Sequence, residues 1–78
     1  MYEVWVSSFP GNDLHTLERI VRKNNRTYTD KDVFAAAKKV QSGQELMLRG
    51  FHEEEIAARL LQEVELHGGK GEVRSAEG

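Results

Sequence analysis

Two spacings of apolar residues alternate along this chain, and their order limits the folds that it can adopt. Three short runs alternate apolar with polar residues, as in a β-strand that buries one face. Three longer runs place apolar residues three and four positions apart, as in a helix with one buried stripe. The resulting order is strand, helix, helix, strand, helix, strand, which predicts an α+β fold.

Turn and capping residues mark the limits of these elements. Asp13 is expected to cap the first helix, and Thr29 and Asp32 resemble a capping box at the start of the second. Gly43 and Gly68 follow the second and third helices, where glycine accepts the left-handed conformation that ends a helix. With their caps, the helices are expected within residues 13–25, 29–43 and 53–69, and the strands at residues 2–7, 45–49 and 71–75.

Three strands are not stable alone in water, so the three helices are expected to cover one face of the sheet. A helix joins the second and third strands, which favours a parallel direction for this pair, with the first strand central in a mixed sheet. We expect one domain over residues 1–75 and a frayed tail at residues 76–78. The predicted core consists of Val4, Val6, Leu17, Ile20, Val21, Phe34, Ala37, Leu46, Leu48, Ile56, Leu60, Leu61, Val64 and Val73.

The composition excludes several classes of protein. With 78 residues, the chain is long enough for one domain only. It has no cysteine, which excludes disulfides and thiolate metal sites and fits a cytoplasmic location. No apolar run approaches the ~20 residues that span a membrane, so we expect no membrane partner. Met1 leads directly into a predicted strand, so we expect no signal peptide.

Patterns of catalytic residues are absent from the sequence. His15, His52 and His67 are far apart and lack the spacing of a helical zinc pair, and no serine is flanked by glycines as in a nucleophile motif. The carboxylates at residues 53–55 are expected to stabilise the positive end of a helix dipole. We therefore expect no enzymatic activity, no metal and no cofactor.

The order of elements and several segments resemble known domains. Residues 2–6, and residues 50–57 with their strand end, acidic cap and helix start, are similar to the C-terminal domain of the bacterial ribosomal stalk protein. They are also similar to the related adaptor family of the Clp protease, and residues 61–73 resemble the last helix, glycine turn and final strand of both families. This resemblance covers residues 2–75 and implies the fold described above and a role in binding protein partners.

The functional motifs of both families differ from this sequence. The stalk family binds translation factors through its first two helices, lysines and a glycine-rich turn, whereas residues 25–29 contain no glycine. The adaptor family holds the N-terminal residue of its substrate with an Asn-Asp-Asp run, where this chain has Ser7, Ser8 and Phe9. Its histidine near the end of the second helix is replaced by Gln41. The resemblance therefore implies protein binding without assigning either activity.

Basic residues gather on the first two predicted helices. Seven basic and two acidic residues lie between Arg19 and Lys39, whereas residues 44–78 contain four basic and eight acidic ones. A solvated face at a helix C-terminus, a site for an acidic protein and a nucleic-acid site would each explain this pattern. The candidate partner-binding residues are Leu14, Glu18, Arg19, Arg22, Lys23, Arg26 and Tyr28.

A second candidate interface lies on the other face of the predicted sheet. If the side chains of Val4 and Val6 point towards the helices, alternation places Trp5 on the far face. Such an apolar spot among charges is typical of an interface, including a weak homodimer. The alternative is a tryptophan covered by arginine side chains through cation–π contacts. The residues expected on this face are Trp5, Met47, Arg49 and Arg74.

These observations predict a non-enzymatic macromolecule-binding module, adaptor-like, with an unidentified protein as its partner. The alternative is a small nucleic-acid-binding domain that uses the basic face of the first helix and the connector after it. Nucleic acid is the second choice because the net charge is −2 and because the connector lacks the Gly-x-x-Gly sequence of KH-type RNA-binding domains.

Overall fold

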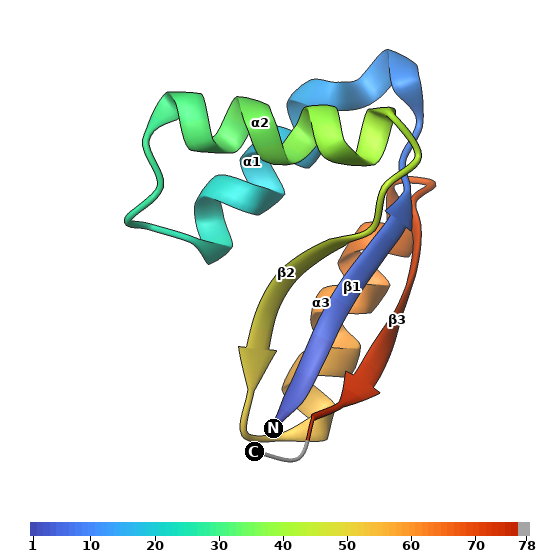
Figure 1. Cartoon of the computed structure of the whole chain (residues 1–78). Helices are drawn as coiled ribbons and strands as arrows, with labels where there is room; N and C mark the ends of the chain where they lie inside the picture. The colour runs from blue at the N-terminus through green and yellow to red at the C-terminus, as the bar shows by residue number, and fades with distance from the viewer. Residues whose placement is uncertain (77–78) are drawn as a thin grey trace.

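The computed structural model describes residues 1–76 and confirms the predicted order of elements (Figure 1). A short 3-10 turn, η1 (Gly11–Asp13), precedes the first helix. No helix among residues 1–76 is both long enough and apolar enough to cross a bilayer. The other elements are β1 (Tyr2–Ser8), α1 (Leu14–Asn24), α2 (Asp30–Gln41), β2 (Leu46–Phe51), α3 (Glu54–Leu66) and β3 (Lys70–Ser75).

The sheet has the order β2-β1-β3, with the first strand central as expected. Both neighbours of β1 run antiparallel to it, so β2 and β3 point in the same direction without touching. The expected mixed sheet is therefore wrong. Because β1 lies between the two strands that run the same way, every adjacent pair is antiparallel.

The pairing of β1 with β2 contains a β-bulge. Val4 lies opposite Arg49, but the next residue of β1, Trp5, lies opposite Met47. Leu48 is therefore an extra residue in β2 that has no partner in β1. Beyond it, each side chain of β2 points to the opposite face from the one that strict alternation predicts.

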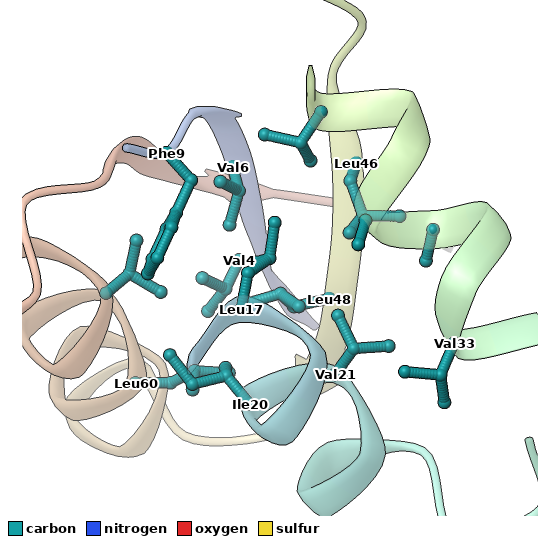
Figure 2. Packing of buried hydrophobic residues seen from close by; sticks show 14 of the residues in the cluster. Val4, Val6, Phe9, Leu17, Ile20, Val21, Val33, Leu46, Leu48 and Leu60 are labelled. Atoms are coloured by element: carbon teal, nitrogen blue, oxygen red, sulfur yellow. The ribbon is translucent and has the colours of Figure 1, made fainter. Parts of the chain in front are cut away.

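Buried side chains from all three helices pack on one face of the sheet. α3 runs along the sheet behind β1, whereas α1 and α2 lie at the end where β1 finishes and β2 begins (Figure 1). Val4, Val6 and Leu48 form the sheet side of the core and are 0%, 0% and 1% exposed. Figure 2 shows helical side chains around them, including those of Leu17 and Leu60.

The prediction that Phe34 and Ile56 belong to the core is wrong. The side chains of Phe34 and Ile56 are exposed, by 55% and 41% respectively. Each lies one position away from the buried stripe of its helix, and one position is a rotation of about 100°. The buried stripes are Val33, Ala36, Ala37 and Val40 in α2, and Ala57, Leu60 and Val64 in α3.

Local hydrogen bonds explain why the helices begin and end where they do. The predicted capping box of α2 is confirmed, since the Asp32 backbone N–H donates to the Thr29 hydroxyl and the Thr29 N–H donates to the Asp32 carboxylate. Gly43 and Gly68 have φ values of 91° and 88°, the left-handed conformation expected after α2 and α3. Asp13 precedes α1, but its carboxylate accepts from the Thr16 hydroxyl at 2.6 Å and from no backbone N–H.

The two ends of the described chain are joined by backbone hydrogen bonds. The Ala76 N–H donates to the Met1 carbonyl at 2.8 Å, and the Met1 ammonium donates to the Ala76 carbonyl at 3.2 Å. Ala76, which was expected in a frayed tail, is thus held against the start of β1. The rest of that expected tail, residues 77–78, lies outside the described residues.

The different burial of Leu48 and Ile56 predicts that shortening each side chain to alanine changes the free energy of unfolding by different amounts. Leu48→Ala should lower the free energy of unfolding by about 2–5 kcal/mol, because it removes a buried side chain and leaves a cavity. Ile56→Ala, also apolar but half in solvent, should cost less than ~1 kcal/mol. Urea unfolding followed by circular dichroism measures both, and equal losses would contradict the observed core.

Candidate functional site

The bulge in β2 brings Arg49 to the helix side of the sheet. Arg49 lies opposite Val4, and the side chain of Val4 is in the core. The guanidinium of Arg49 stacks 5.0 Å from the ring centre of Phe51. Phe51 itself packs partly buried against the core. The expectation that Arg49 shares the face of Trp5 is wrong, because the extra residue Leu48 reverses the alternation beyond it.

Arg49 thereby joins the cations at the end of α1. A hollow of about 560 Å³, here called the connector hollow, lies where α1, the connector at residues 25–29 and β2 meet. Three of its lining side chains are basic and none is acidic, so the hollow has a positive potential. It is lined by Lys23, Asn24, Asn25, Arg26, Thr27 and Arg49.

The cations of this region differ in whether the protein neutralises them. Arg22 pairs with Asp30 at 3.0 Å, and Lys23 pairs with Glu63 at 3.3 Å. Within residues 1–76, Arg26 and Arg49 form no salt bridge. Two guanidinium groups of the connector hollow are therefore available to an external anion.

Asn25 attaches the connector to β2 beside the bulge. Its side-chain amide donates to the carbonyl of Val21 at 3.0 Å, which satisfies one of the last carbonyls of α1. The same amide donates to the carbonyl of Leu48 at 3.1 Å. Asn25 has a φ of −138°, so α1 ends through this side chain and not through a left-handed residue. These hydrogen bonds hold Arg26 and Arg49 on either side of one hollow.

The connector also offers backbone donors. The Tyr28 N–H donates to the Asn25 carbonyl at 3.0 Å and closes a tight turn. The backbone N–H groups of Arg26 and Thr27, inside that turn, donate to no backbone carbonyl of the described chain. They add two exposed hydrogen-bond donors to a region that already carries positive charge.

A second hollow, here called the α2 groove, lies at the other end of the connector. Its volume is about 380 Å³, and its surface combines an aromatic ring, small apolar side chains and one cation. Within residues 1–76 that cation, Lys39, forms no salt bridge. The groove is lined by Tyr28, Asp32, Ala35, Ala36, Lys39 and Leu46.

The other predicted residues of the first candidate surface are more scattered. Leu14 is partly buried against the core, where it packs and does not present a contact surface. Glu18 lies 3.6 Å from the His15 ring and lines a shallow hollow with Arg19 and Arg22. The predicted residues therefore fall into separate groups, and only Lys23 and Arg26 line the connector hollow.

Trp5 is covered on its exposed side by one arginine. Arg74 extends from β3 across β1 and bonds to Glu45 beside β2, with its guanidinium 4.5 Å from the ring centre of Trp5. It also bonds to Glu72 at 2.7 Å, and this bond comes first among the causes that raise the pKa of Arg74. The Trp5 indole N–H donates to Glu3 at 3.1 Å. Trp5 thus has an internal partner on its face and at its edge.

Comparisons with known proteins add no family to this description. A scan of protein-family models, a search of curated proteins and a search of solved structures each returned no match. Among residues 1–76, no group of three or more His, Asp or Glu side chains is placed to hold a metal ion.

Four residues that line the connector hollow were not predicted to lie there: Asn24, Asn25, Thr27 and Arg49. The period of two in β2 assigned Arg49 to the far face, and nothing in the pattern marks Leu48 as an extra residue. Asn25 enters the sequence-based expectations only as the last residue of the first helix. The sequence signal that could have indicated this site is the pair of amides, Asn24 and Asn25, at the end of a helix and directly before Arg26.

Asn25→Ala should destabilise the fold more than Asn24→Ala. Both amides bond to a carbonyl at the end of α1, but only Asn25 also bonds to β2. We expect losses of about 1–3 kcal/mol for Asn25→Ala and about 0.5–1.5 kcal/mol for Asn24→Ala in urea unfolding. Amide hydrogen exchange at residues 48–51 should accelerate only in Asn25→Ala, and equal exchange in both variants would contradict the attachment.

Arg74→Ala should uncover Trp5. The indole ring loses the guanidinium that lies over it, so acrylamide should quench its fluorescence more strongly than in the unaltered protein. Arg59→Ala, which removes an exposed arginine of α3, is the matched control and should leave quenching unchanged. Equal quenching in Arg74→Ala and the unaltered protein would show that the ring is shielded in another way.

Proposed function

We propose that this protein is a binding module without chemistry of its own, and that it holds an acidic segment of a partner protein. The observation that supports this most directly is the meeting of Arg26 and Arg49 in the connector hollow, where neither has a carboxylate partner in the described chain. Lys23 also lines this hollow and adds a third basic side chain beside the two guanidinium groups.

The chemistry of arginine suits this role. Its planar guanidinium binds a carboxylate through two parallel hydrogen bonds and is less strongly hydrated than the lysine ammonium. Arg49 is also oriented by stacking on Phe51, so less side-chain freedom is lost when it binds an anion. The free N–H groups of Arg26 and Thr27 can add hydrogen bonds to the same anion.

A protein partner is preferred to nucleic acid for reasons of charge. The net charge is −2, and residues 44–78 carry eight acidic side chains against four basic ones, so this part of the molecule repels a long phosphate backbone. A short acidic segment can bind one basic surface without meeting the rest. In the stalk family that the sequence resembles, the first two helices also bind protein partners, which supports the same choice.

Nucleic acid remains the second candidate function because guanidinium groups and free N–H groups around a connector also suit phosphates. The Trp5 face is a weaker candidate surface for a partner or a homodimer. Arg74 covers the ring there, and a partner would have to displace its bonds to Glu45 and Glu72.

Charge reversal at Arg26 and Arg49 should remove binding of a glutamate-rich peptide. We expect Arg26→Glu and Arg49→Glu each to weaken binding at least ~10-fold, because charge-assisted hydrogen bonds are lost and repulsion is added. Nuclear magnetic resonance titration at low salt measures the affinity and should show shifts at residues 23–27 and 49. Arg59→Glu on α3 carries the same charge change and should bind normally.

The same titration decides between the candidate partners. Single-stranded RNA and DNA of matched charge should bind more weakly than the peptide. Tighter, steeply salt-dependent binding of an oligonucleotide would favour the nucleic-acid function instead. Absence of salt-dependent binding to both kinds of ligand would contradict the proposal.

A further inference from the structure

We infer that the partner segment carries an apolar side chain a few residues from its acidic one, and that this apolar side chain occupies the α2 groove. The inference rests on the proposed function and specifies its ligand as an extended acidic and apolar peptide. It follows from the lining of the groove and from its position relative to the connector hollow.

The lining of the α2 groove suits an apolar side chain. The Tyr28 ring, 39% exposed, forms part of the surface, with the small Ala35 and the nearly buried Ala36 and Leu46 beside it. A hollow of about 380 Å³ is small for a binding site but sufficient for one large side chain. Covering this surface removes apolar area from water, which stabilises the complex.

Charges around the groove select which residue enters it. Asp32 lines the groove, and its carboxylate accepts a hydrogen bond from the Thr29 N–H. This negative charge disfavours an acidic side chain inside the groove. Lys39 favours a negative charge at its own position, so a segment with acidic residues flanking an apolar one complements the groove.

The groove and the connector hollow share two elements. Thr27 lines the hollow and the next residue, Tyr28, lines the groove. On β2, Leu46 lines the groove and Arg49 lines the hollow, and three residues of a strand span roughly 10 Å. An extended peptide covers the same distance in about three residues. One short segment can therefore occupy both places.

β2 itself is not the docking element for a partner strand at this point. It lies at an edge of the sheet, but the Leu48 carbonyl beside the bulge already accepts from the Asn25 amide. A partner backbone that paired there would have to share that carbonyl with the Asn25 amide and lie against the connector that this bond holds in place. Side-chain contacts with the two hollows are therefore favoured over strand addition.

Two peptides test the inference. One is glutamate-rich with a leucine three residues after a glutamate, and the other has serine in place of the leucine. The leucine peptide should bind at least ~10-fold more tightly. Ala35→Gln, an exposed substitution that should leave α2 folded, should abolish this advantage without weakening the serine peptide. Gln41→Ala, on the same helix outside the groove, should leave both affinities unchanged.

The outcomes separate the inference from the function on which it rests. If both peptides bind equally, and both depend on Arg26 and Arg49, the groove has no role and the proposed function stands. An advantage of leucine that persists in Ala35→Gln would place the apolar side chain elsewhere and overturn the inference. If neither peptide binds in a salt-dependent manner, inference and proposed function are both wrong. Thermal unfolding of each variant shows that it is folded before titration.

Discussion

The pairing of β1 with β2 around Leu48 is the constraint on which both candidate surfaces depend. Val4 and Val6 are fully buried on the central strand, so the register of β1 is set by the core. Leu48 is also buried, and the extra residue in β2 is accommodated by the bulge. The next residue, Arg49, therefore points to the helix side of the sheet. Its guanidinium lies beside the end of α1 and not on the face of Trp5.

The exposed edge of β2 illustrates how the same residues serve stability and recognition. An edge strand offers unpaired carbonyls on which other chains can pair. The Asn25 amide covers one of these carbonyls and at the same time ends α1. The connector is thereby held close to β2, and the cations on either side of it cannot separate by much. Repulsion between them is compatible with folding because both side chains are exposed, so water and dissolved salt screen their charges.

Local signals in the sequence predicted most of the fold. Thr29 with Asp32, and Gly43 with Gly68, act through neighbours a few residues away, and their roles were predicted correctly. Phe34 and Ile56 were misplaced because each adjoins a buried stripe, and a sequence pattern resolves the edge of a stripe poorly. Arg49 was misplaced because a bulge depends on pairing with β1, which is distant in sequence. The candidate site inherits this limit, since its two halves are 23 residues apart at Asn25 and Leu48.

The bonds between Met1 and Ala76 have a practical consequence. Both ends of the described chain emerge together beside the start of β1, while α1 and α2 occupy the opposite end of the molecule (Figure 1). A dye, an affinity handle or a surface tether attached through Met1 would therefore leave the connector unobstructed. Immobilised domains would present their cationic end to solution in a uniform orientation.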